Sequence, residues 1–283
     1  MGKLLAVDLD GTLFYPRQKK SCISKKNIKF LRDFIDEGNK LVLVTSRSHQ
    51  FTLKLKDEIQ RPFDVINCTS SQIYAGDKII RDVPMEPKDL KEVINFLDET
   101  HRPFAYLMTT ENYPCIIKQN VPLNKFLLWS YNRYYKHQRC YQEPYIIDND
   151  IFDKELENSK VYKVMVFYGF GRNKKKLSKE LNKLLREKHP MIESSWTLIV
   201  NELTPLNCNK SYGIRYYCNY FGIDKKDVYV VGDSGNDISM FNEFHENSYV
   251  MSHAYPSVKK YAKHVVSRVF KLREYVLKGE KES

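Results

Sequence analysis

Leu4-Leu5-Ala6-Val7-Asp8-Leu9-Asp10-Gly11-Thr12-Leu13 is the stretch of sequence that decides the fold of this chain. Four apolar residues lead directly into two aspartates one residue apart, and a glycine and a threonine follow. Such an apolar run is typical of a strand buried on both faces inside a parallel sheet. Gly11 then permits a tight turn. The pattern therefore predicts that both aspartates lie at the carboxyl end of a central strand, where open α/β sheets bind their ligands.

The spacing of Asp8 and Asp10 suggests a chemistry. Residues two apart in an extended strand point the same way, so the two carboxylates would repel each other unless a cation lay between them. A hard divalent ion with oxygen ligands relieves this repulsion, and we expect Mg²⁺. One carboxylate could then attack an electrophile while the other serves as acid and base. The alternative is a turn in which either aspartate only caps backbone N–H groups, and this short motif alone does not decide between the two.

Length and composition limit the classes of protein to which the chain can belong. Its 283 residues suffice for one large domain or two modest ones. We find neither an apolar window of the ~20 residues that span a bilayer nor a secretory signal, so we expect a cytoplasmic protein without a membrane partner. The six cysteines and seven histidines show no metal-ligand or disulfide spacing.

The net charge of the chain is +11, and its basic residues form short clusters at 17–20, 25–26 and 172–176. A basic surface can steer an anionic substrate or attract nucleic acid. Solvated lysine-rich faces are the more ordinary explanation of such clusters. Because the chain has no recognised nucleic-acid-binding motif, we do not expect nucleic acid as a partner. The sequence leaves the oligomeric state open.

The order of the remaining elements predicts a doubly wound, Rossmann-like α/β core with a parallel sheet. Buried strands are expected at 40–44, 64–68, 228–231, 249–251 and 264–266, and helices are expected to begin after Ser24 and at Lys210. The middle of the chain reads as a separate α/β layer of about 120 residues, with short elements at 104–109, 123–135, 160–167, 174–188 and 196–200. We therefore predict a core domain at 1–82 and 204–283 and an inserted cap domain at 83–203.

Polar side chains recur where these predicted strands end. Thr45 and Ser46 follow the second strand, where hydroxyls and backbone N–H groups suit phosphate oxygens, although either residue could simply cap the next helix. The stretch Gly232-Asp233-Ser234-Gly235-Asn236-Asp237 follows a later strand and again combines carboxylates with glycines. Because carboxyl ends of parallel strands share one edge of a sheet, these groups, Lys210 and the first aspartates would meet there.

In this order the groups resemble the motifs of the haloacid dehalogenase superfamily of phosphohydrolases. Those motifs are DxDGT, a threonine or serine after the second strand, a lysine, and GDxxND. The long insertion between the second and third motifs, and the ending Met251-Ser252-His253-Ala254, resemble the Cof-type IIB branch. The resemblance covers nearly the whole chain. It implies the superfamily's α/β core with an inserted cap that governs specificity.

The resemblance also implies a role for each of these residues. Asp8 would be the nucleophile that forms an aspartyl phosphate, and Asp10 would protonate the leaving group and later activate water. Mg²⁺ would bind the Asp8 carboxylate, the Asp10 main-chain carbonyl and Asp233. Asp237 would orient the lysine or a metal-bound water. A set of hydroxyl, amide and ammonium donors would hold the phosphoryl oxygens: Thr45, the backbone N–H groups of Leu9 and Ser46, Lys210 and Asn236.

The function predicted in this way is an Mg²⁺-dependent phosphatase of small phosphorylated metabolites. Sugar phosphates are the commonest substrates of the family, and phosphorylated cofactors such as flavin mononucleotide or pyridoxal phosphate are alternatives. A phosphomutase or phosphotransferase would use the same intermediate but exclude water. A non-catalytic phosphate- or nucleic-acid-binding protein is a further alternative, against which the intact carboxylates argue. The chain departs from the family pattern at three places on the rim of the site: Ser46, Ser70-Ser71-Gln72 and Ser252-His253.

Overall fold

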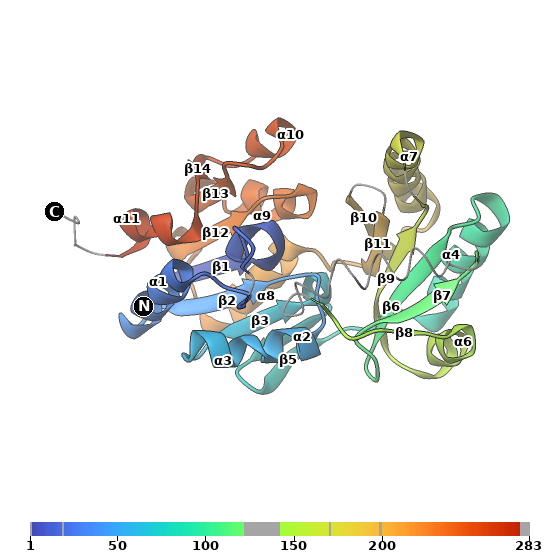
Figure 1. The fold of residues 1–283 in the computed structure, drawn as a ribbon, viewed down its shortest axis with the longest axis horizontal. Coiled ribbons are helices and arrows are strands. Elements are labelled where there is room, and N and C mark those ends of the chain that lie inside the picture. The colour runs from blue at the N-terminus through green and yellow to red at the C-terminus, as the bar shows by residue number, and fades with distance from the viewer. Residues whose placement is uncertain (1, 19, 122–141, 170, 198–199, 278–283) are drawn as a thin grey trace. The chain divides into compact units, whose positions relative to one another are not determined.

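The computed structural model describes residues 2–18, 20–121, 142–169, 171–197 and 200–277, and it divides into two compact units (Figure 1). The first, here called the core unit, comprises Met1–Arg81 and Asn209–Ser283. The second, here called the inserted unit, comprises Asp82–Cys208. The inserted unit is one continuous segment, so the chain leaves the core unit once and returns to it once.

The core unit is organised around a sheet with the strand order β14-β13-β12-β1-β2-β3-β4-β5. Neighbouring strands from β14 through β3 are parallel, while β4 returns antiparallel to β3. The predicted doubly wound α/β fold is therefore confirmed, with the first strand at the centre of the sheet. The strands span Leu4–Asp8 (β1), Lys40–Val44 (β2), Asp64–Asn67 (β3), Gln72–Ala75 (β4), Lys78–Asp82 (β5), Val228–Gly232 (β12), Ser248–Met251 (β13) and His264–Val266 (β14).

Local sequence signals mark the start of one helix of the core unit and the end of another. Ser24 caps the first helix by accepting a hydrogen bond from the Asn27 backbone N–H, as predicted. Gly222 ends the helix that begins at Lys210, with the positive φ of +65° that favours glycine. The helices span Lys25–Asp36 (α1), His49–Leu53 (α2), Leu55–Ile59 (α3), Lys210–Phe221 (α8), Ile238–Glu243 (α9), Pro256–Lys259 (α10) and Arg273–Val276 (α11).

The alternation of side chains along β1 decides which helix the first aspartate faces. Leu4 and Ala6 belong to a buried cluster that contains Ile214 of α8 and Phe241 of α9. Because successive strand residues point to opposite faces, Asp8 lies on the same face as Leu4 and Ala6. The strand pattern therefore directs the Asp8 side chain toward the layer to which α8 belongs.

The inserted unit contains a second sheet with the order β10-β11-β9-β6-β7-β8. Its helix α4 buries Leu90, Val93, Ile94 and Leu97 against that sheet, at the helical spacing that the sequence shows. The strands span Ala105–Thr110 (β6), Ile116–Gln119 (β7), Ile146–Ile147 (β8), Val161–Phe167 (β9), Ile192–Thr197 (β10) and Val200–Pro205 (β11). The helices span Pro87–Thr100 (α4), Asn149–Asn158 (α6) and Arg172–Lys188 (α7).

Of the elements predicted for the inserted unit, one differs from the structure and another lies outside the described residues. The single element expected at 196–200 is wrong, because β10 ends at Thr197 and β11 begins at Val200, and these two strands pair antiparallel through those residues. A short apolar run cannot distinguish one strand from the adjoining ends of two strands. The element expected at 123–135 lies outside the described residues. Within the described part of the chain, no helix has both the length and the apolar character needed to cross a membrane.

The connection after β3 carries backbone strain. Cys68, Thr69 and Ser70 have φ values of +44°, +56° and +84°, in the left-handed region that disfavours residues other than glycine. This bend runs into Ser70-Ser71-Gln72, one of the places where the chain departs from the family pattern. Hydrogen bonds hold the bend in place, since the Cys68 N–H donates to the Arg47 carbonyl (3.1 Å) and the Thr69 N–H to the Thr45 carbonyl (3.0 Å). The strained bend therefore fixes the backbone that follows β2.

Candidate active site

The register of the central strands brings three separate loops to one edge of the core sheet. In the parallel pairing of β1 with β2, Asp8 lies opposite Val44, so Thr45 begins the neighbouring loop. On the other side Val7 lies opposite Val231 of β12, so Asp233 follows closely. The predicted convergence of polar groups at this edge thus follows directly from the strand order.

Lys210 lies between two carboxylates at the start of α8. Its Nζ donates to Asp8 Oδ1 and to Asp237 Oδ1, at 2.6 Å in each case. The Lys210 and Asp237 side chains are fully buried, and that of Asp8 is 7% exposed. Asp237 thus contacts Lys210, which is one of the two partners that the resemblance implies for it. The arrangement fixes one positive charge beside the end of β1.

Burial and charge shift the acid–base behaviour of this group. Burial is the main cause that raises the pKa of Asp8 well above its ordinary value; Lys210 offsets part of that effect, and the Asp237 and Asp233 charges raise the pKa further. For Lys210 burial acts against the charged form, but the two carboxylates outweigh it and raise its pKa. Lys210 therefore stays an ammonium ion at neutral pH, while Asp8 needs positive charge nearby to remain a carboxylate.

Asp233 lies against the turn that follows β1. The Thr12 hydroxyl donates to Asp233 Oδ1 at 3.1 Å, and His253 Nε2 lies 3.7 Å from Oδ2. Gly11 has a φ of +83°, and a side chain there would overlap the Asp233 carboxylate, so only glycine fits. Burial, followed by the Asp237 charge, raises the pKa of Asp233 to about 7.

The carboxylates offer oxygen ligands for a divalent cation. One oxygen each of Asp8, Asp233 and Asp237 lie within 4.8 Å of one another. Asp237 is already engaged, because its Oδ2 accepts from the Asp233 and Ser234 backbone N–H groups and its Oδ1 accepts from the lysine. Asp8 Oδ2, by contrast, is buried without a hydrogen-bond partner. Asp8 and Asp233 are therefore the side chains that fit a hard cation such as Mg²⁺.

The expectation that Asp8 and Asp10 point the same way is wrong. The strand ends at Asp8, and Leu9–Leu13 form a tight turn instead of continuing it. The Asp10 carboxylate, 43% exposed, accepts two hydrogen bonds from Arg47, from Nε at 2.6 Å and from Nη2 at 2.7 Å. The guanidinium carbon of Arg47 also lies 3.9 Å from the centre of the Phe51 ring. Each of the two aspartates thus pairs with a different basic side chain, Asp8 with Lys210 and Asp10 with Arg47.

Arg47 is the residue of this site that sequence reasoning missed. It directly follows Thr45 and Ser46, and that position was the available signal. Thr45 is buried and its Oγ1 accepts from the Arg47 N–H at 3.1 Å. Asn236 Oδ1 accepts from the Ser234 hydroxyl at 2.7 Å. Within the described residues, Thr45 and Asn236 come to the edge of the site without a hydrogen bond to Asp8 or Lys210, and Leu9 and Ser46 lie in the adjoining turns.

Known proteins resemble this chain along most of its length. A family model described as haloacid dehalogenase-like hydrolase matches residues 5–269. A Bacillus subtilis protein named 5-amino-6-(5-phospho-D-ribitylamino)uracil phosphatase is 26% identical over 254 residues, which cover 84% of each chain.

Solved structures share the fold. A haloacid dehalogenase-like hydrolase from B. subtilis superimposes with a TM-score of 0.78 at 20% identity, covering 97% of this chain and 100% of that one. A subclass IIB sugar phosphatase gives a TM-score of 0.72 at 20% identity, covering 96% and 98%.

Proposed function

The chain belongs to the haloacid dehalogenase-like hydrolases, so it is an enzyme, and we propose that it is an Mg²⁺-dependent phosphatase whose nucleophile is Asp8. The observation that carries this proposal is the buried Asp8–Lys210 pair, held by Asp237 and bordered by Asp233. Phosphoryl transfer depends mainly on positioning and on neutralising charge, and this arrangement supplies both.

The proposed reaction has two steps on the same carboxylate. An oxygen of Asp8 attacks the phosphorus of a phosphate monoester, the bond to the leaving oxygen breaks, and Asp10 gives that oxygen its proton. Asp10 then takes a proton from water, which attacks the same phosphorus, releases orthophosphate and restores Asp8. The partial exposure of Asp10 allows a leaving group to reach it.

The other residues of the site hold charge in place. Lys210 neutralises part of the negative charge of the phosphoryl group. Asp237 orients the Lys210 ammonium group toward Asp8. Bound Mg²⁺, held by Asp8, Asp233 and the Asp10 main-chain carbonyl, would reduce the repulsion between the nucleophile and an anionic substrate. We propose that the remaining phosphoryl oxygens are bound by Thr45, Asn236 and the backbone N–H groups of Leu9 and Ser46.

For the substrate we propose a phosphate monoester on a sugar or sugar-alcohol chain. Two relatives support this choice, since the B. subtilis protein is named a phosphatase of a phosphoribityl compound and the solved subclass IIB protein a sugar phosphatase. We propose that the inserted unit, as a cap domain, selects among such substrates. The test is a screen of sugar phosphates with orthophosphate release as the readout, in which transfer to an added sugar, without release, would instead identify a phosphotransferase.

We expect hydrolysis of p-nitrophenyl phosphate to require Mg²⁺ and to stop when EDTA is added.

The affinity for Mg²⁺ should also depend on pH, because in the metal-free protein the pKa of Asp233 is raised to about 7. Below that pH the carboxyl is protonated and must release its proton to bind metal, so the apparent Kd should rise by up to about tenfold per pH unit as the pH falls. Titration calorimetry at pH 6, 7 and 8 measures this. Full turnover in EDTA, or a Kd that does not change with pH, would contradict the assigned metal site.

Replacing Arg47 by lysine should lower kcat by about tenfold, because lysine cannot make the two parallel hydrogen bonds that orient Asp10. Arg61 provides a matched control, since its Nε and Nη2 bind Asp36 in the same two-pronged way (2.6 and 3.0 Å). Steady-state kinetics of the Arg47→Lys and Arg61→Lys variants separate a role of Arg47 in catalysis from a general effect of replacing a paired arginine by lysine. Equal kcat values for the Arg47→Lys and Arg61→Lys variants would show that Arg47 does not position the acid–base group.

A further inference from the structure

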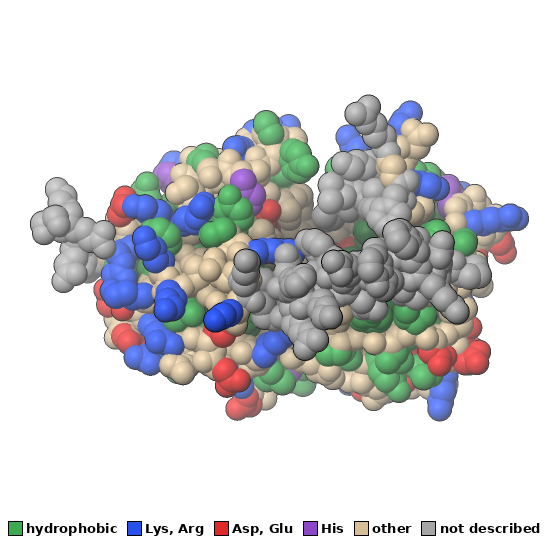
Figure 2. All heavy atoms as spheres, in the orientation of Figure 1, with side chains coloured by type: hydrophobic (Ala, Val, Ile, Leu, Met, Phe, Trp, Pro, Cys, Tyr) green, Lys and Arg blue, Asp and Glu red, His purple; other side chains and the backbone are tan. Residues whose placement is uncertain are grey.

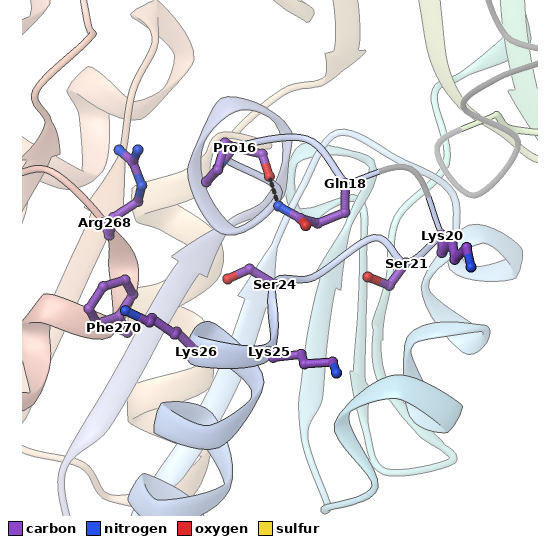
Figure 3. A pocket seen from close by; sticks show the side chains of 9 residues that line it. All are labelled: Pro16, Gln18, Lys20, Ser21, Ser24, Lys25, Lys26, Arg268 and Phe270. Carbon is purple, nitrogen blue, oxygen red and sulfur yellow. Dashed lines mark hydrogen bonds between the residues drawn. The ribbon is translucent and has the colours of Figure 1, made fainter.

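A cavity of about 770 Å³ on the core unit lies between two segments that are distant in the sequence, residues 16–26 and residues 268–270 (Figure 3). Lys20 lies on the loop that precedes α1, Lys25 and Lys26 form the first turn of α1, and Arg268 and Phe270 lie after β14. Figure 3 shows Arg268 and Phe270 on one side of this cavity and Lys20 on the other, with Lys25 and Lys26 between them. The cavity thus brings two of the basic clusters of the sequence together with a remote arginine.

The wall of this cavity is positively charged. Lys20, Lys25, Lys26 and Arg268 line it, and no acidic residue is among its lining residues. Ion pairs link many other basic residues of the described chain to carboxylates, but none involves these four. Figure 2 shows lysine and arginine side chains gathered over this part of the core unit. These four side chains place positive charge on the wall of one cavity, and the resulting electrostatic potential attracts anions.

We propose that this cavity binds a small anionic ligand with two or more phosphoryl groups. Several phosphoryl charges match four cations, and the cavity volume falls within the range of small-molecule sites. Phe270 adds an apolar surface, with Lys26 Nζ 5.4 Å from the centre of its ring. Because the cations surround a hollow instead of following a line, the geometry favours a compact ligand over the extended backbone of a nucleic acid.

The cavity is connected to the candidate active site through a series of side-chain contacts. The Arg268 guanidinium carbon lies 4.6 Å from the centre of the Tyr15 ring, and that ring lies 4.0 Å from the His253 ring. His253 in turn lies 3.7 Å from Asp233. The proposed ligand would therefore bind beside the catalytic centre without using its residues, and the proposal does not depend on the reaction assigned above.

Tripolyphosphate is a suitable probe, with binding measured by calorimetry on the full chain in buffer that contains EDTA. EDTA removes divalent cations that could bridge tripolyphosphate to the carboxylates of the catalytic centre, and the lysine variants described below test whether the remaining binding occurs at the cavity. We expect one tripolyphosphate to bind per chain. Bound tripolyphosphate should also protect Lys20, Lys25 and Lys26 from acetylation, as mass spectrometry can show.

The Lys25→Gln/Lys26→Gln variant should bind tripolyphosphate about tenfold or more weakly, because it loses two charged partners of the ligand. The control is Lys179→Gln/Lys183→Gln on α7 of the inserted unit, which lowers the net charge by the same two units and should change the Kd by less than about twofold. The two lysines replaced in each double variant are exposed, so neither double variant should change the unfolding temperature of the protein appreciably.

Three results would overturn the proposal. Equal weakening by both double variants would show attraction to net charge alone, without a site. No binding to the wild type at about 1 mM tripolyphosphate would exclude a site of useful affinity. Tighter binding of a single-stranded oligonucleotide, with the same dependence on Lys25 and Lys26, would show that the ligand of this cavity is a nucleic acid and not a small molecule.

Discussion

Replacing Asp8 by asparagine is expected to lower the turnover of p-nitrophenyl phosphate by about 10⁴-fold or more, as for other nucleophiles whose removal ends covalent catalysis. The asparagine amide cannot form the phosphoryl intermediate, and it also removes a carboxylate ligand of the metal. The measurement is kcat at saturating Mg²⁺. The loss should appear in kcat and not only in KM, since the interaction that disappears is the reacting bond itself.

The same variant should keep the fold. Asparagine has nearly the same shape, and Lys210 retains its hydrogen bond to Asp237. Asp77→Asn, at a side chain that is 90% exposed, controls for the loss of one carboxylate elsewhere. Rapid quenching of the wild type should also trap phosphate on Asp8. Undiminished turnover by Asp8→Asn, or label on a different residue, would show that the nucleophile lies elsewhere.

Replacing Lys210 by methionine is expected to lower the free energy of unfolding at pH 7.5 by about 3–5 kcal/mol, the usual cost of removing one partner from a buried ion pair. The lysine bonds to Asp8 and Asp237, and all three side chains are buried. Methionine fills a similar volume but leaves two carboxylates facing each other without a cation. Urea denaturation of the variant and the wild type in Mg²⁺-free buffer measures the difference in the free energy of unfolding.

The loss at Lys210→Met should shrink as the pH falls from 8 to 5. The raised pKa of Lys210 means that its stabilising charge is fully present below the ordinary lysine pKa of 10.5, so it does not titrate in this range. Asp8, whose pKa is already well above its ordinary value, takes up a proton first and so removes a buried charge. The double variant Lys210→Met/Asp237→Asn should be destabilised less than Lys210→Met. A loss that is constant with pH and undiminished in the double variant would point to lost packing instead of unpaired charge.

The sequence by itself determined the elements of the core and their order. The apolar run before Asp8, the cap at Ser24 and the glycine at 222 are local signals, because they act through strand alternation, backbone N–H capping and backbone conformation within a few residues. The order of strands and helices then predicted a parallel sheet. Family membership, predicted from the motifs at the strand ends, is confirmed by the match over residues 5–269. The roles assigned to the site residues stay predictions.

Only the tertiary structure decided which charged groups pair directly. The strand order predicted that Lys210 and Asp8 would come to the same edge of the sheet, but only the structure shows their hydrogen bond across 202 positions of the sequence. Nothing in the sequence predicted that Asp10 would bind Arg47, 37 positions away. The basic cavity likewise needs Arg268 and Lys25, from opposite ends of the chain, to line the same space. Sequence periodicity shows which face of an element is buried. It does not show which side chain from a distant element fills the space opposite, because that depends on how the packed layers bring separate loops together.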